Sequence, residues 1–300
     1  MPTAVALRPR AFSELFDAAF LLARAHFRPL ATLSAMVAIP AIALGVVNAA
    51  LFGPAATLGA ATDATAIART LPLTLATMCW YFVGLAALLH AASNAYLGEP
   101  VDPAASLRRA TARAAPIIGA HVVAYLAALA VLSLAIAVAF VAGMALTFAL
   151  GQAGVRVASQ AAIGLAVGGA AVIGGFAVGA AVLARYATMS AVLMLEGGGA
   201  IAALRRSSAL SAGHRWRIVG LLGILLVLSL VFSLTALGVG SLAGNAYISN
   251  LVATILSIPL YPLIASVLTA LYYDLRIRKE GFDIAHAARE LGGAAPGAAA

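Results

Sequence analysis

The feature that most constrains this chain is a stretch of 56 residues, 218–273, without a charged side chain. Four shorter charge-free stretches cover 29–62, 70–98, 114–155 and 157–184. Charged residues make up 9% of the chain and hydrophobic residues 64%, whereas a typical soluble domain has about 25% charged residues. A water-soluble fold could not bury this much apolar surface, so the sequence predicts that lipid surrounds most of the chain.

The lengths of these stretches predict how often the chain crosses the membrane. A helix needs about 20 residues to cross the hydrocarbon core, so 29–62, 70–98 and 157–184 each hold one span. The longest stretch holds two, with residues 240–250 as a polar turn between them. The stretch 114–155 is long enough for one span followed by an apolar loop, or for two short spans.

The basic residues decide between these alternatives. With six spans and both termini inside, all but two of the 18 lysine and arginine residues lie on the inner side, the exceptions being Arg69 and Arg156. Two spans within 114–155 would destroy this bias, which is typical of cytoplasmic segments. We therefore predict an all-α, polytopic membrane helix bundle in the cell membrane, with both termini cytoplasmic. Its six transmembrane helices are expected near 31–53, 71–97, 115–141, 158–184, 218–239 and 250–273.

A short basic motif indicates internal repetition. Leu-Arg-Arg occurs at 107–109 and again at 204–206, each time before a pair of predicted spans. The amphipathic segment 12–27, expected to lie in the membrane interface and to end at Pro29, precedes the first pair. We predict three parallel repeats, each a surface helix followed by two spans, although the motif could also recur by chance. The units cover about 11–97, 103–184 and 200–273 of a single membrane domain (1–288), which a flexible Ala/Gly tail (289–300) follows.

Glycine and proline residues within the spans predict local packing. The fourth span has two pairs of glycines spaced four apart, Gly164 with Gly168 and Gly175 with Gly179, which favour close helix packing. Prolines interrupt the first and sixth spans, and a kink there could expose a carbonyl to a substrate path. The prolines concerned are Pro40, Pro259 and Pro262.

Four segments resemble the six-span family named after the membrane domain of glycerophosphoryl diester phosphodiesterase. They are FSELFDAAFLLARAHF with AIP (12–40), YLGEPVD (96–102), LEGGGAIAALRRSSALSAGHRWRI (195–218) and YPLIASVLTALYYDLRIRKEGFD (261–283). The resemblance covers about residues 8–288, is most specific in its last segment, and implies the membrane architecture. In that family, phosphodiesterase activity belongs to a separate barrel domain with a His-Arg-Gly motif. Here the only His-Arg is followed by Trp216, and no soluble segment is long enough for a barrel, so the resemblance does not imply that activity.

Polar residues within the predicted spans are candidate functional groups because they are costly in hydrocarbon. The second span carries His90 and Asn94, and the third carries His121 and Tyr125, one turn apart in each case. The two histidines are expected at similar depth in adjacent helices, where they could face one cavity. A neutral pair bonded to Asn94 or Tyr125 would join helices, whereas a proton-linked or headgroup-binding site is the functional alternative. Two histidines without a carboxylate make a poor zinc site, so no metal is predicted.

The charged segment that closes the last span is predicted to stop the helix at the membrane surface. Two tyrosines are expected at the headgroup level, two charge pairs spaced i,i+4 would extend the helix, and Gly281 would end it before a surface helix at 282–290. A binding role for Asp274 or Arg276 in an inward-facing cavity is the alternative. Candidate contacts to anionic lipid or to a cytoplasmic protein partner are Arg108, Arg109, Arg205, Arg206, Arg215, Arg217, Tyr272, Tyr273, Asp274, Arg276, Arg278 and Glu280.

The sequence lacks a nucleophile–base pair, paired carboxylates and a phosphate-binding loop, so we predict no enzyme, no catalytic residue and no cofactor. The formal charge of +8 is attributed to the inner membrane face and not to nucleic-acid binding. Lys279 is the one lysine, which is typical of a GC-rich prokaryotic genome. The leading hypothesis is permease-like transport, or handling of a small, amphipathic or lipid substrate. The alternative is a non-catalytic scaffold or regulatory subunit that docks a cytoplasmic partner on its arginine-rich inner face.

Overall fold

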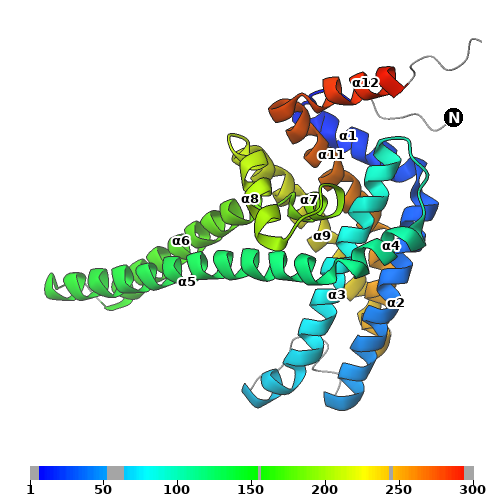
Figure 1. Cartoon of the computed structure of the whole chain (residues 1–300). Helices are drawn as coiled ribbons and strands as arrows, with labels where there is room; N and C mark the ends of the chain where they lie inside the picture. The colour runs from blue at the N-terminus through cyan, green and yellow to red at the C-terminus, as the bar shows by residue number, and fades with distance from the viewer. Residues whose placement is uncertain (1–6, 53–63, 155–156, 243–245, 294–300) are drawn as a thin grey trace, which may run out of the picture.

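The computed structural model describes residues 7–52, 64–154, 157–242 and 246–293, and every regular element in these ranges is an α-helix (Figure 1). The helices are α1 (Phe12–Ala25), α2 (Phe27–Phe52), α3 (Ala64–Tyr96), α4 (Pro103–Ala112), α5 (Ala114–Gln152), α6 (Val157–Ala184), α7 (Met189–Leu195), α8 (Ala200–Ser211), α9 (Arg215–Ser241), α10 (Ala246–Ser257), α11 (Leu260–Glu280) and α12 (Phe282–Gly293).

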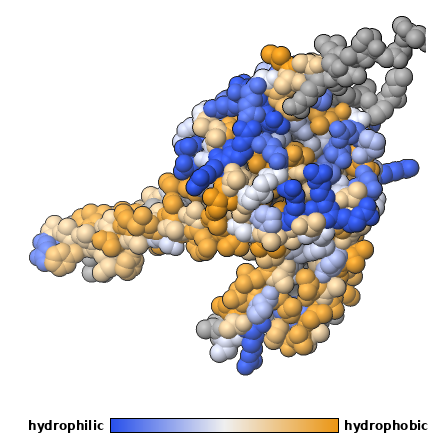
Figure 2. Space-filling model, viewed as in Figure 1, coloured by the Kyte–Doolittle hydropathy of each residue, from blue (hydrophilic) through white to orange (hydrophobic). Residues whose placement is uncertain are grey.

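Most of the short helices lie in one half of the molecule. Figure 1 shows α1, α12 and the end of α11 at the top, with α8 and α4 below them and above the lower ends of α2 and α3; we call the region of these five helices the polar end. Helices α2 and α3 extend downward from it, whereas α5 and α6 form a long hairpin that extends to the left. Hydrophilic residues are concentrated over the polar end, and the two hairpins are almost entirely hydrophobic on the surface shown in Figure 2.

Within the described ranges, five helical segments are long and apolar enough to cross a membrane, or six if the bent pair α10–α11 forms one span. They begin at Phe27, Ile67, Ala114, Gly164 and Arg215, close to the starts of the first five predicted spans. The prediction of an all-helical chain is confirmed, and the helices are consistent with a multi-pass membrane protein. Each of α1, α4 and α8 directly precedes one of the long apolar pairs in chain order.

The region 114–155 differs from both alternatives considered for it. Helix α5 is continuous from Ala114 to Gln152, 39 residues, so the prediction of a loop after residue 141 is wrong. The sequence between Gly119 and Gly143 contains neither glycine nor proline, and nothing there breaks the helix. At 1.5 Å per residue α5 is about 58 Å long, which is longer than a hydrocarbon core of about 30 Å.

Proline interrupts the sixth span as predicted, and proline positions also explain where the helices differ from the prediction. The sixth span is broken into α10 and α11, bent by 40°, because Pro259 stands at the N-cap of α11. Pro40 lies inside α2 without ending it. Helix α1 ends at Ala25 and not at Pro29, since Pro29 falls in the first turn of α2, where a missing N–H is tolerated.

The surface helices form where their end residues satisfy the backbone. Asp102 accepts hydrogen bonds from the N–H groups of Ala104 and Ala105, which caps α4. Gly281 adopts φ 61° at the end of α11, as predicted from the αL cap. The surface helix that follows is confirmed but runs to Gly293, into the segment expected to be a flexible tail. The rest of that tail, 294–300, lies outside the described residues.

Helix α1 does not present its apolar face to the membrane interface as expected. Its residues Leu15, Ala19 and Leu22 are buried, and α1 packs against α11. Protein therefore covers the face that the sequence pattern assigned to lipid, while Phe20 and Leu21 on its other side are exposed.

Close helix contacts are made at glycines. A Cβ atom on Gly84 of α3 would lie 2.3 Å from Cγ1 of Val37 in α2, so these helices touch where only a hydrogen atom fits. In α6, Gly175 packs against Ala135 of α5, and Gly164 approaches Thr147. The other glycine of each predicted pair, Gly168 and Gly179, has no such neighbour within 4 Å, so one glycine per pair packs against α5.

Candidate functional site

The end of α11 carries a carboxylate that joins three parts of the chain. Asp274 is 1% exposed. Its Oδ2 pairs with Nε of Arg278 at 2.9 Å and with Nη1 of Arg217 at 3.3 Å, and its Oδ1 accepts the backbone N–H of Arg10 at 2.8 Å. A buried carboxylate is stable only when it is paired and hydrogen-bonded in this way.

The two arginines around Asp274 also hold the chain segment that precedes α1. The carbonyl oxygen of Arg10 accepts hydrogen bonds from Nη2 of Arg217 at 2.6 Å and from Nη2 of Arg278 at 2.7 Å. We call this set of four residues the Asp274 clasp. It connects the segment that precedes α1 to α9 and α11.

A second charged network lies beside the clasp. Arg206 of α8 bridges two carboxylates, pairing through Nε with Glu196 at 2.7 Å and also with Glu280. Arg276 pairs with Glu280 at 3.1 Å, and the Tyr272 hydroxyl donates to Glu196 at 2.8 Å. The adjacent Arg206 guanidinium lowers the pKa of the Glu280 carboxyl, and hydrogen bonds to Glu280 and Glu196 raise the pKa of Arg206.

These networks correct several sequence-based interpretations. Tyr272 and Tyr273 are 0% and 3% exposed, so their side chains are enclosed by protein and do not contact lipid headgroups. The Tyr273 ring stacks on Tyr96 at 4.8 Å between centroids, and its hydroxyl is 2.6 Å from that of Ser93 in α3. Tyrosine occurs both in protein interiors and at membrane interfaces, because its ring is apolar and its hydroxyl finds a hydrogen-bond partner in either place.

The predicted charge pairs of α11 are present, and both belong to the two networks described above. Asp274–Arg278 and Arg276–Glu280 are both confirmed. The buried Asp274 is fully occupied by the clasp, so it does not face an inward cavity. Glu196, which precedes α8, pairs with Arg206 of that helix.

The candidate arginines fall into two groups. Arg206, Arg217, Arg276 and Arg278 belong to the two networks. The other four are exposed on the polar end and are the ones able to meet a headgroup or a partner: Arg108, Arg109, Arg205 and Arg215.

The two candidate histidines have different partners. Nδ1 of His90 is 3.0 Å from the Ser106 hydroxyl of α4, in place of the expected bond to Asn94. The ring of His121 stacks on Phe82 at 4.1 Å between centroids, and its Nδ1 donates to the Ile117 carbonyl at 2.8 Å. Each histidine therefore contacts a neighbouring helix: His90 of α3 contacts α4, and His121 of α5 contacts α3.

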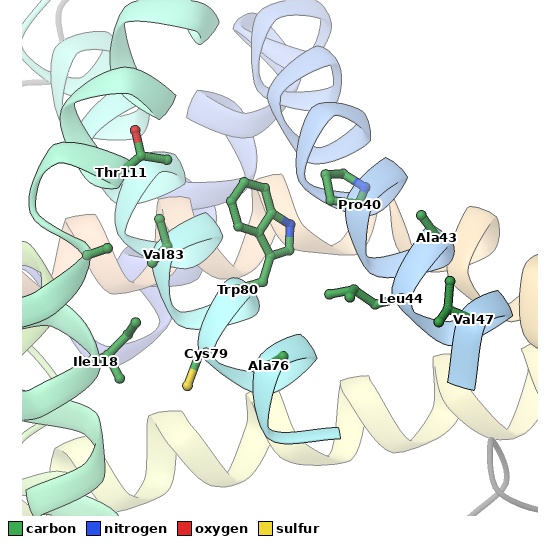
Figure 3. A pocket seen from close by; sticks show the side chains of 11 residues that line it. Pro40, Ala43, Leu44, Val47, Ala76, Cys79, Trp80, Val83, Thr111 and Ile118 are labelled. Carbon is green, nitrogen blue, oxygen red and sulfur yellow. The ribbon is translucent and has the colours of Figure 1, made fainter. Parts of the chain in front are cut away.

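An apolar groove of about 530 Å³ lies between α2, α3 and the start of α5. Figure 3 shows Pro40 and Leu44 of α2 on one side, Ile118 of α5 on the other, and Trp80 of α3 between them. The Trp80 indole N–H donates to the Val37 carbonyl at 2.7 Å, one turn before Pro40, so this hydrogen bond joins α3 to α2 beside the groove. Thr111, at the end of α4, is the lining residue of the groove that belongs to the polar end.

Sequence reasoning did not identify this groove. Pro40 was considered for a kink, but Trp80 and Cys79 were not connected with a site. A tryptophan within a span carries an N–H that needs a partner, and that requirement was the available signal. Among the residues that the structure describes, no group of three or more His, Cys, Asp or Glu is placed to hold a metal ion.

Comparison of the chain with protein-family models, curated proteins and solved structures finds no match.

Proposed function

We propose that this protein is a six-span membrane protein that handles an anionic membrane lipid, with an acyl chain bound in the groove between α2, α3 and α5. The observation that carries the proposal is the groove itself, which is apolar and open among helices long enough to cross the membrane. Membrane lipid surrounds such helices, so a lipid chain reaches the groove without passing through water.

The size and lining of the groove suit an acyl chain. Its volume of about 530 Å³ lies within the range of about 300–1,000 Å³ that is usual for ligand sites. Its walls are formed by side chains such as Leu44, Val47, Val83 and Ile118. An acyl chain has no polar group that would lose hydrogen bonds to water on entering such an apolar lining.

The polar end supplies a place for the headgroup. Thr111 lines the groove, and Arg108, exposed and three positions earlier in α4, is on the same side of that helix. A guanidinium group pairs with phosphate oxygens in a bidentate manner. Each basic group near an anionic membrane surface adds about 1 kcal/mol of attraction, which favours an anionic over a zwitterionic lipid.

The proposed architecture is that of three repeats, each a surface helix and two spans, with both termini cytoplasmic. The order of α1, α4 and α8 before the long pairs supports it, as does the resemblance to the phosphodiesterase membrane-domain family. The sixth span is then formed by α10 and the apolar part of α11, up to residue 273. Helix α5, about 58 Å long, is longer than the hydrocarbon core even when tilted, so part of it extends beyond the core.

The experiment uses Trp80 as the reporter of the groove, in a Trp216→Phe variant that removes the other of the two tryptophans of the chain. The variant is reconstituted in mixed vesicles of phosphatidylcholine and phosphatidylglycerol in which one or the other lipid is brominated on its acyl chains. At equal fractions of brominated lipid, we expect Trp80 to be quenched more strongly by brominated phosphatidylglycerol than by brominated phosphatidylcholine, and Arg108→Gln to reduce this difference.

Equal quenching of Trp80 by the two brominated lipids, in proportion to their bulk fractions, would overturn binding of an anionic lipid in the groove. The scaffold hypothesis would then be the one to pursue, with Arg205, Arg215 and Trp216 as the exposed groups that face a protein partner.

A further inference from the structure

A second cavity, of about 280 Å³, lies on a different face of α3 from the groove. The groove is lined by α3 residues 76, 79, 80 and 83, and the cavity by 81, 82, 84, 85 and 88. Its lining brings together aromatic side chains from three helices: Tyr81 and Phe82 of α3, His121 and Tyr125 of α5, and Tyr261 of α11. Nothing in the handling of an acyl chain by the groove requires this arrangement.

The aromatic rings around the cavity leave room for one more ring. Phe82 stacks on His121 at 4.1 Å and on Tyr125 at 5.6 Å between centroids, and Tyr81 lies 6.2 Å from Tyr261. A cavity of about 150 Å³ is enough to hold benzene. The cavity therefore accommodates a substituted six-membered ring, and ring-on-ring contacts of this kind favour an aromatic over an aliphatic ligand.

His121, one of the lining residues of the cavity, has one ring nitrogen whose protein partner is distant. The carbonyl of Ile117 can only accept, so Nδ1 of His121, at 2.8 Å from it, carries the hydrogen. The ring is 4% exposed, and burial in an apolar setting keeps it neutral, which leaves a lone pair on Nε2. The nearest partner of Nε2 is the Ser190 hydroxyl at 3.4 Å, a long distance for a hydrogen bond.

We propose that this cavity binds a hydroxylated aromatic ring, with its O–H donating to Nε2 of His121 and its ring packed among Phe82, Tyr81 and Tyr261. A free phenol and the ring of a lipid-soluble quinol share this chemistry. Tyr125, 47% exposed, stands at the side of the cavity through which such a ligand enters.

The probe is 4-fluorophenol, followed by ¹⁹F NMR on the full chain in nanodiscs, with empty nanodiscs to identify the signal of probe dissolved in lipid. We expect a saturable protein-bound resonance. The matched probe 4-fluorotoluene, which lacks the hydroxyl, should bind about tenfold more weakly, the usual effect of one buried hydrogen bond. A short-chain hydroquinone that displaces 4-fluorophenol more strongly than phenol does would identify the quinol as the better ligand, and the reverse order would identify the free phenol.

Two variants test the role assigned to His121. His121→Phe keeps the stack on Phe82 and removes the acceptor, so 4-fluorophenol should bind about tenfold more weakly while 4-fluorotoluene is unaffected. Ser190→Ala removes the competing donor, so 4-fluorophenol should bind a few-fold more tightly even if His121→Phe does not fold. The proposal is overturned if no saturable resonance appears, if the two probes bind equally, or if Ser190→Ala weakens binding.

Discussion

The backbone N–H of Arg10 donates a 2.8 Å hydrogen bond to Oδ1 of Asp274, a residue 264 positions later in the chain. The carbonyl of the same Arg10 accepts from Arg217 and Arg278, the two cations that neutralise Asp274. The segment that precedes α1 and the end of α11 are thus fixed to each other by one buried carboxylate.

Asp274→Asn is expected to destabilise the protein by about 3 kcal/mol, because it leaves two guanidinium groups without their buried counter-ion. The measurement is thermal unfolding in a fixed detergent. Asp17→Asn is the matched control: Asp17 is exposed on α1, and surface changes of this kind usually stay within about 0.5 kcal/mol. Equal effects of the two substitutions would contradict the structural role given to the clasp.

The network around Arg206 is expected to weaken in acid. Since Arg206 lowers the pKa of Glu280 below its ordinary value of 4.5, the unfolded chain binds more protons at this group than the folded one does as the pH falls below that value. The stabilisation from Glu280 is therefore complete above about pH 4.5 and is lost as the pH drops through the lowered pKa.

Unfolding temperatures from pH 7 to pH 3 measure this effect as a difference between variants. Arg206→Gln should lower stability near pH 7 and flatten part of the acid loss. Arg205→Gln, one position away and exposed, should keep the profile of the unmodified chain. If Arg205→Gln flattens the profile and Arg206→Gln does not, the assignment of Glu280 to Arg206 is wrong.

The contact of α2 with α3 at Gly84 is expected to tolerate no added carbon. Gly84→Ala places a Cβ atom 2.3 Å from Val37, and overpacking of this kind costs about 1–3 kcal/mol. Val37→Ala in the same chain should recover much of that loss, since it removes the atoms that clash. Gly45→Ala, in the same α2 but with nothing within 4 Å of the new carbon, should be neutral or stabilising; a loss as large as that of Gly84→Ala would show a general helix effect.

Side-specific labelling tests the proposed six spans. In a Cys79→Ser background, Arg108→Cys and Arg205→Cys should react with a membrane-impermeant maleimide from the cytoplasmic side. Arg69→Cys should react from the opposite side, because one span separates it from each neighbouring inner segment. Labelling of Arg108→Cys and Arg205→Cys from different sides would refute the arrangement.

Local features of the fold were predictable because they depend on short-range chemistry. The charge pairs Asp274–Arg278 and Arg276–Glu280 follow from helix geometry alone, and so does the αL cap at Gly281. The length of α5 was not predicted. The prediction ended the helix within the apolar run 114–155 at the length that crosses the bilayer, although no helix breaker stands there.

The candidate site was less accessible to sequence reasoning. Arg205 and Arg206 are adjacent and chemically identical, yet one is exposed and the other bridges two carboxylates from different segments. The histidines His90 and His121 were correctly placed on neighbouring helices, but their partners Ser106 and Ser190 come from surface and short helices whose positions the spans do not specify.

The sequence by itself determined that this chain is helical, that it carries several apolar segments of membrane length, and where many of its helices begin and end. Charged side chains are excluded from hydrocarbon whatever the tertiary structure, and a helix cap involves only a few neighbouring residues. Both effects can therefore be recognised in the sequence. Only the tertiary structure decided which apolar and aromatic side chains face protein and which remain exposed. Tyr272 and the buried face of α1 show why: a protein interior and a bilayer present nearly the same chemistry to an apolar surface, and only contact with a distant segment distinguishes them.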